Sequence, residues 1–138
     1  MGRGVFLIEN QADLSDFRDL TNIAYIQEYL KTDRDIRVVV IGNKAVHAYW
    51  RIAPPGEFRS NVAVGGKVDL DNVPKEAIEL ALHTARSCRW DDVGIDICMY
   101  EGKPYVFEGN MKYGKEGFRA AGMDYISLME ELIEDGCI

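Results

Sequence analysis

The apolar and polar positions of the chain alternate in two segments that each predict a β-hairpin. The segment DIRVVVIGNKAVHAYWRI, residues 35–52, has apolar runs on both sides of Gly42-Asn43, a two-residue turn signal. The segment GIDICMYEGKPYVFEGN, residues 94–110, has apolar runs on both sides of a second, glycine-containing turn. Shorter apolar or β-branched runs predict further strands at residues 5–8 and 22–30. Because the strands mostly pair with a neighbour along the chain, we expect an α+β fold with an antiparallel sheet.

Three segments have the spacing of apolar residues that is typical of helices. The clearest is VPKEAIELALHTARSC, residues 73–88, in which Pro74 suits the first helical turn. Its apolar stripe consists of Ala77, Ile78, Ala81, Leu82, Ala85 and Cys88. A shorter helix is expected over residues 12–20, and a last one begins at the N-cap Asp124 and ends at Gly136.

The composition is that of one globular domain, with 138 residues, 47% hydrophobic and 28% charged. A net charge of −7 argues against nucleic acid as the main partner, although a local basic patch or a metal can still bind phosphate. No apolar run approaches the roughly 20 residues of a membrane span, and no leader is recognisable. The widely spaced Cys88, Cys98 and Cys137 match no zinc pattern and favour a reducing compartment. We therefore expect a cytoplasmic protein with no nucleic-acid or membrane partner.

The second predicted hairpin carries Asp96, Glu108 and Asn110, which are unusual residues for a pair of apolar strands. Glu108 and Asn110 share one face of their strand because they are two residues apart. A three-residue loop at 101–103 would bring Asp96 opposite Glu108, whereas a two- or four-residue loop would need a β-bulge to do so. Opposed carboxylates repel each other, and a hard cation such as Mg²⁺, which prefers these oxygen ligands, would offset the repulsion. The alternative is a solvated hairpin face with ordinary acids.

Two further groups of polar residues have a simple and a functional interpretation. Arg59, Ser60 and Asn61 lie in a glycine- and proline-rich segment, where an arginine either clamps a phosphate or carboxylate or is merely solvated. Asp35 and Arg37 share one face of a predicted strand, and an exposed ion pair is the simpler interpretation.

Taken together, these segments resemble the ATP-grasp superfamily, and closely its RimK-like branch of glutamate ligases that modify amino acids and proteins. The resemblance covers nearly the whole chain and rests on the order and spacing of AYIQEYL, DIRVVVIGNKAV, GEFRSNVAVGG, GIDI and FEGN. It implies an ATP-grasp C-terminal subdomain over residues 31–138, with an antiparallel sheet and flanking helices. Residues 1–30 would be a strand–helix–strand remnant of the small ATP-grasp subdomain, ending in the hinge.

The resemblance also implies roles for individual residues. Glu28 and Tyr29 resemble the hinge whose backbone meets the adenine, and Asp35 resembles the contact on the ribose side. The segment of residues 59–61 resembles the family's RSN segment beside the phosphates, with Arg59 as the catalytic residue that holds charge on the transferring phosphoryl group. The three polar residues of the second hairpin, Asp96, Glu108 and Asn110, match the ligands of Mg²⁺ or Mn²⁺.

The implied activity is that of a carboxylate–amine ligase with ATP as co-substrate. ATP phosphorylates a carboxylate, and an amine then attacks the acyl-phosphate to give an amide. The first five residues, MGRGV, resemble the end of the family's glycine-rich phosphate lid, so we expect the N-terminal domain, most of the small subdomain and a phosphate-binding lysine to be missing. The alternative function is therefore a non-catalytic fragment or regulatory module. We also expect an exposed sheet edge that forms a homodimer.

A second departure from the family lies directly after Asn110. The family continues N-x-x-P-G, whereas this chain reads NMKYGK, with Tyr113 in place of the proline. Lys112, Lys115 and Arg119 in this region favour an anionic acceptor, which would be an amino acid or an acidic peptide or protein. The alternative is an ordinary basic surface loop.

Overall fold

The computed structural model describes residues 5–18, 24–56 and 66–138, which fall into two compact units, residues 1–31 and 32–138. In the first unit the described residues form one helix, α1 (Gln11–Arg18), as expected. The Asn10 side chain caps its start by accepting a hydrogen bond from the Ala12 amide at 2.9 Å. The Asp13 carboxylate in turn accepts hydrogen bonds from the amides of Glu9 and Asn10, at 2.8 and 3.1 Å.

The strands expected at residues 5–8 and 24–30 are wrong, since these described residues have no regular structure. Apolar and β-branched residues favour a strand only where a neighbouring strand pairs with them and buries one of their faces. Here Val5 is 53% exposed, Tyr25 86% and Ile26 77%, so within their own unit these side chains have no such cover.

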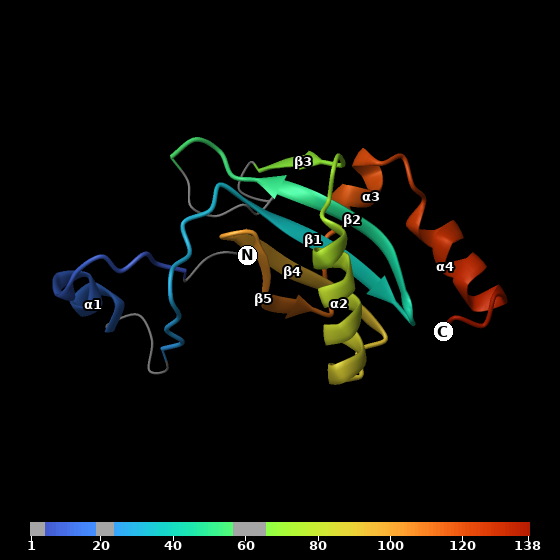
Figure 1. The fold of residues 1–138 in the computed structure, drawn as a ribbon, viewed down its shortest axis with the longest axis horizontal. Helices are drawn as coiled ribbons and strands as arrows, with labels where there is room; N and C mark the ends of the chain where they lie inside the picture. The colour runs from blue at the N-terminus through green and yellow to red at the C-terminus, as the bar shows by residue number, and fades with distance from the viewer. Residues whose placement is uncertain (1–4, 19–23, 57–65) are drawn as a thin grey trace. The chain divides into compact units, whose positions relative to one another are not determined.

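The second unit is built on a five-stranded antiparallel sheet, which confirms the predicted sheet type (Figure 1). The strands lie in the order β3-β2-β1-β4-β5. Their bounds are β1 (Arg34–Ile41), β2 (Lys44–Ile52), β3 (Lys67–Asp69), β4 (Asp92–Tyr100) and β5 (Lys103–Asn110). Both predicted hairpins are present, and Ile41 pairs with Lys44 across the Gly42-Asn43 turn. The three-residue strand β3 was not predicted, since it follows a glycine-rich segment and is too short to show alternation.

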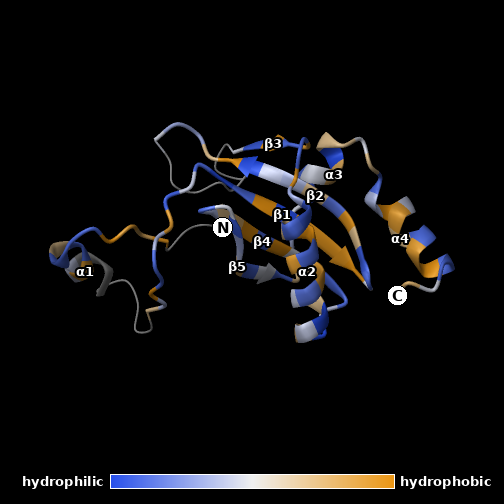
Figure 2. Ribbon diagram, in the orientation of Figure 1, coloured by the Kyte–Doolittle hydropathy of each residue, from blue (hydrophilic) through white to orange (hydrophobic). Residues whose placement is uncertain are grey.

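Helix α2 (Lys75–Cys88) packs against one face of the sheet and forms the larger core (Figure 1). The alanines of its stripe, Ala77, Ala81 and Ala85, are fully buried. They contact alternate residues of β1 and β4, namely Ile36, Val38, Val40, Val93, Ile95 and Ile97. Figure 2 shows the hydrophobic residues concentrated in these two central strands. Pro74 is the N-cap of α2 rather than part of its first turn, and Cys88 at its other end is exposed.

The opposite face of the sheet is covered over part of its length by α3 (Glu116–Ala120) and α4 (Tyr125–Glu134). The buried side chains of this second core are Val39, Ile41, Tyr113, Phe118 and Leu132. The predicted N-cap Asp124 is confirmed, because its carboxylate accepts hydrogen bonds from the Ile126 amide at 3.2 Å and the Ser127 hydroxyl at 2.7 Å. Helix α3 was not predicted because five residues are too few to show helical periodicity.

Close packing of α3 on β2 depends on Gly117, because a Cβ there would lie 2.1 Å from the Tyr49 ring. No helix in the described part of the chain is long and apolar enough to cross a membrane. The remainder of this second face, toward Asp35 and Asp96, carries charged side chains instead of a helix-covered core.

Candidate functional site

The turn of the second hairpin has two residues, not the three that the simpler prediction required. Tyr100 pairs with Lys103, and the intervening Glu101 and Gly102 both have positive φ, at 49° and 75°. Two consecutive residues with positive φ are typical of the tight turns that match the twist of a hairpin.

A β-bulge restores the register that the second hairpin needs. Asp96 pairs with Glu108, whereas the next residue, Ile97, pairs with Val106, so Phe107 is the extra residue. The bulged alternative is therefore the correct one, and Asp96 lies opposite Glu108 as expected. The bulge turns Glu108 and Asn110 toward the face of the sheet that carries Asp96.

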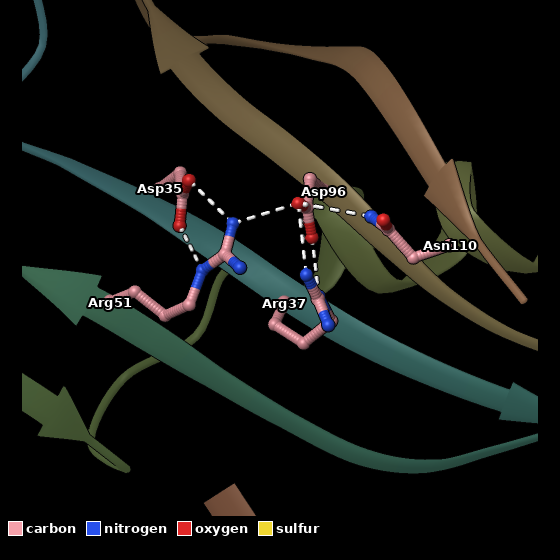
Figure 3. Close-up of polar contacts among 5 residues, drawn as sticks. All are labelled: Asp35, Arg37, Arg51, Asp96 and Asn110. Atoms are coloured by element: carbon pink, nitrogen blue, oxygen red, sulfur yellow. Dashed lines mark hydrogen bonds and ion pairs between the residues drawn. The ribbon is translucent and has the colours of Figure 1, made fainter. Parts of the chain in front are cut away.

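Four strands contribute to a buried cluster of charged and polar side chains on this face (Figure 3). We call the set Asp35, Arg37, Arg51, Asp96 and Asn110 the charged cluster. The sheet register makes two of its contacts, because Asp35 pairs with Arg51 and Arg37 pairs with Asp96. The four charged residues are each 6% exposed or less, and Asp96 is only 1% exposed. The predicted exposed ion pair of Asp35 and Arg37 is thus wrong, because the neighbouring strands bury both residues and supply their partners.

Asp96 lies at the centre of the charged cluster and accepts hydrogen bonds at both carboxylate oxygens. The Arg37 guanidinium binds it as a fork, with Nε donating to Oδ1 and Nη2 donating to Oδ2 at 3.0 Å. Nη2 of Arg51 lies 2.8 Å from the same Oδ2, and Nδ2 of Asn110 donates to it at 3.3 Å. Oδ2 of Asp96 therefore has three nitrogen donors around it.

Arg51 also forms a fork with Asp35, with both nitrogen–oxygen distances at 2.7 Å. Burial disfavours the charged guanidinium, but the hydrogen bonds to Asp35 and the charge of Asp96 outweigh it and raise the pKa of Arg51. With two guanidiniums and two carboxylates, the charges of the cluster balance, which is what allows charged groups to be buried.

Gly94 on β4 leaves room for a side chain of the charged cluster. It lies two residues before Asp96 on the same face of β4, and its Cβ would lie 3.0 Å from Cδ of Arg37 and 2.9 Å from Cβ of Tyr113. The missing side chain therefore leaves the space in which Arg37 reaches Asp96.

The predicted site residues are distributed unevenly over the described structure. Asp35, Asp96 and Asn110 belong to the charged cluster, and the exposed Glu108 lies beside it on β5. Glu28 and Tyr29 are exposed in the unit of residues 1–31, which is described by itself. Arg59, Ser60 and Asn61 lie outside the described residues.

Sequence reasoning missed Arg51 and the true partner of Arg37. Strand alternation places Asp35 and Arg37 on one face, but the Gly42-Asn43 turn alone would pair Asp35 with Trp50. A β-bulge at Val46 shifts the register and brings Arg51 opposite Asp35. The pairing of Arg37 with Asp96 joins residues 59 positions apart, so no local signal reveals it.

The side chains around Asp96 suit a divalent cation in their donor chemistry. No group of three His, Cys, Asp or Glu residues that could hold a metal occurs in the described ranges. Asp96 and Glu108 nevertheless supply two carboxylates, and the Asn110 side chain supplies a third oxygen if its amide rotates away from the hydrogen bond to Asp96. These are the oxygen ligands that Mg²⁺ prefers, with water and phosphate completing its shell. The fit has one further condition, namely that a guanidinium nitrogen leaves Asp96.

Solved structures of ATP-grasp ligases share the fold of this chain. A D-alanine–D-alanine ligase from Bacillus anthracis matches 92% of this chain with a TM-score of 0.62 and 14% identity, over 48% of its own length. The ATP-grasp ligase PsnB, complexed with a minimal precursor, matches 76% of this chain with a TM-score of 0.58 and 22% identity, over 35% of its own length. The chain therefore has the fold of ATP-grasp ligases.

The comparison of sequences is more specific. The RimK-like ATP-grasp domain matches residues 1–134, and the chain belongs to this family, as the sequence motifs indicated. A ribosomal protein bS6–L-glutamate ligase from Escherichia fergusonii is 36% identical over 140 residues, covering 96% of this chain and 47% of that protein. A probable alpha-L-glutamate ligase from Nitrosococcus oceani is also 36% identical, covering 96% of this chain and 46% of its own length. The chain thus spans less than half the length of these relatives.

Proposed function

We propose that this chain is part of an ATP-dependent carboxylate–amine ligase and carries one side of its nucleotide and metal site. The observation that supports this most is the charged cluster, in which buried arginines and the carboxylate of Asp96 lie beside Glu108 and Asn110. A cluster of this kind offers donors for phosphate oxygens and ligands for a hard cation on the same patch of sheet.

Asp96, Glu108 and Asn110 would hold Mg²⁺ or Mn²⁺, which when bound neutralises charge on phosphate oxygens. Arg37 and Arg51 present planar guanidinium groups, whose fork geometry suits phosphate as well as carboxylate.

We assign the remaining nucleotide contacts by family membership. The backbone of Glu28 and Tyr29 would meet the adenine, and Asp35 would contact the ribose while its carboxylate is held by Arg51. Ser60 and Asn61 would lie beside the phosphates with Arg59, which would act on the transferring phosphoryl group as the catalytic residue.

The proposed reaction needs no nucleophile from the protein. A substrate carboxylate takes the γ-phosphoryl group of ATP, releasing ADP. A substrate amine then attacks the carbonyl carbon of the acyl-phosphate, loses a proton, and displaces inorganic phosphate to leave an amide. The contribution of this chain is to bind, orient and stabilise charge with its arginines.

For the acceptor we propose an amino acid or an acidic peptide or protein. One relative is named as a ligase of ribosomal protein bS6, and this name supports the proposal of a protein acceptor. Lys112 and Arg119 are exposed after Asn110 and suit an anionic group. Lys115 does not, because its ammonium lies over the rings of Tyr125 and Tyr113, at 3.2 and 3.9 Å from the ring centroids. Lys115 is therefore not part of the proposed anion-binding surface.

A second candidate function is a non-catalytic or regulatory module that keeps the fold but does not turn over alone. The observation that favours it is that the chain's own side chains, Arg37, Arg51 and Asn110, already engage the carboxylate of Asp96. We further propose a homodimer through the outer edge of β5, where Tyr105 and Phe107 are 43% and 42% exposed. The three cysteines are free, which favours a reducing compartment, and we therefore propose a cytoplasmic location.

Isothermal titration calorimetry with Mg·ATP tests the proposed site. The sample is the full-length protein that contains this chain. Glu108→Gln is expected to weaken nucleotide binding and to abolish turnover. Glu101→Gln, the same chemical change in the turn of the same hairpin, is the matched control and should leave both unchanged. Equal binding and turnover for Glu108→Gln and the wild type would contradict the metal assignment. Ligase activity from the 138 residues alone would reject the non-catalytic alternative.

A further inference from the structure

The central carboxylate of the charged cluster is already fully engaged by the chain's own side chains. Oδ2 of Asp96 has Nη2 of Arg37 at 3.0 Å, Nη2 of Arg51 at 2.8 Å and Nδ2 of Asn110 at 3.3 Å. The side chain of Asp96 is 2% exposed, and that of Arg37 is 7% exposed. When the Asn110 amide turns its oxygen to a cation, one donor leaves Oδ2, but the two guanidinium nitrogens still occupy both lone pairs of this oxygen. A cation that binds Oδ2 must therefore also displace a guanidinium.

The displaced guanidinium needs another anion, because a buried charge without a partner is strongly unfavourable. Arg37 is the residue that can leave, since each hydrogen bond and ion pair described for its side chain goes to Asp96. Arg51 is also held in place by its fork to Asp35. A polyphosphate arriving with its cation supplies the anion that a free cation lacks.

We propose that Arg37 is a positioning residue that guards Asp96, so that the site rejects a free divalent cation and accepts one only together with a polyphosphate. The polyphosphate oxygens receive the Arg37 guanidinium as the cation takes its place on Asp96. This inference rests on the proposed function, because it concerns the metal ligands assigned there. Arg37 would thus determine that the cation binds together with the polyphosphate and not before it.

The experiment measures binding of Mn²⁺ alone, without nucleotide, from the loss of the free Mn²⁺ signal in electron paramagnetic resonance. The wild type should bind free Mn²⁺ weakly, and Arg37→Gln should bind it at least ~10-fold more tightly, since one unit of positive charge leaves Asp96 while a neutral hydrogen-bond donor stays. Arg37→Lys keeps the charge and should restore the weak binding of the wild type. Arg34→Gln removes the same charge from an exposed position on the same strand and should have no effect.

The outcomes distinguish the proposed role of Arg37, which we call the guard, from the proposed function. Equal and tight binding of Mn²⁺ by the wild type and Arg37→Gln overturns the guard but leaves the metal site in place. Failure of both proteins to bind Mn²⁺ overturns the metal assignment, and the guard falls with it. An equal gain in Arg34→Gln reduces the effect to net charge and also overturns the guard.

A measurement on the wild type covers the case in which Arg37→Gln does not fold. The arginine Nε–H groups are observed by ¹H–¹⁵N nuclear magnetic resonance, with Arg37 assigned by the peak that Arg37→Lys loses. Mg²⁺ alone should leave the Arg37 peak in place, whereas Mg²⁺ with ADP should move it. A shift with Mg²⁺ alone, or no shift at ADP concentrations that saturate binding, contradicts the exchange. Absence of any ADP binding contradicts the proposed function instead.

Discussion

Removing Asp96 tests whether the charged cluster depends on mutual compensation of buried charges. Asp96→Ala leaves Arg37 buried at 6% exposure without the carboxylate to which its described contacts go, while Arg51 keeps Asp35. Leaving one buried charge of a pair unpartnered costs about 3–5 kcal/mol of unfolding free energy. Asp33→Ala is the matched control, because its pair with Arg34 is largely exposed, with side chains 72% and 43% accessible. Such surface pairs contribute about 0–1 kcal/mol.

The assay is urea unfolding at pH 7, followed by far-UV circular dichroism and by the fluorescence of Trp50 and Trp90. Unfolding free energies are compared at unchanged m, so that a lower midpoint reports lower stability. Replacing both partners, Arg37→Met with Asp96→Leu, should recover most of the loss, because no buried charge then lacks a partner. A loss in Asp96→Ala no larger than that in Asp33→Ala would refute this account of the cluster.

Three other predictions concern the packing around the site. Gly109→Ala should destabilise the chain by about 1–3 kcal/mol in urea unfolding, because the new Cβ would lie 2.5 Å from the Trp90 ring. Burial lowers the pKa of His47 below 6.5, so the unfolded chain binds protons more readily; stability is full above about pH 6.5 and falls as the pH drops through the lowered value. His47→Gln should remove that part of the pH dependence. Lys115→Met should cost about 0.5–2 kcal/mol, because its ammonium lies 3.2 Å from the Tyr125 ring centroid.

The predictions for His47 and Lys115 each have a control on a comparable exposed residue. His83→Gln, on the exposed surface of α2, should leave the pH profile of stability unchanged. Lys112→Met, in the same loop as Lys115, should change the unfolding free energy by less than about 0.5 kcal/mol. A pH profile unaffected by His47→Gln, or equal losses from the two lysine variants, would count against the contacts described.

Elements that carry their own periodicity could be predicted from the sequence, and elements that depend on a distant partner could not. The alanine stripe of α2 and the turn at Gly42-Asn43 are local signals, and both correspond to observed elements. Residues 24–30 have strand-like composition, but composition forms a strand only beside another strand. The bulge at Phe107 has no local signature, so the opposition of Asp96 to Glu108 could be predicted only as a condition on the loop.

The same limit applies to the charged residues of the site. Strand alternation correctly assigned Asp35 and Arg37 to one face, but their exposure was predicted wrongly because burial depends on β2 and β4. Lys115 looked like part of a basic surface loop because nothing nearby in sequence shows that α4 brings Tyr125 against it. In both cases the sequence shows the residue type, but the residues that contact it are distant in sequence and could not be predicted.

The second face of the sheet is divided along β1, and this division limits where a ligand can bind. Going along the strand, alternate residues change from Asp35 and Arg37 to the fully buried Val39 and Ile41, which α3 and α4 cover. Among the described residues, α3 and α4 cover the apolar half, and the proposed nucleotide and cation would therefore bind at the charged half.

Tyr113 connects the two halves of this face, three residues after Asn110. Burial and the hydrogen bond to Asp92 raise the pKa of its phenol, so its hydroxyl stays protonated and donates to Asp92 at 2.6 Å. Tyr125 from α4 donates to the same carboxylate at 3.3 Å. Side chains on the apolar half therefore anchor the segment after Asn110. The position of Asn110 should therefore depend on the docking of α4, and Tyr113→Phe should loosen this segment without altering the contact between Arg37 and Asp96.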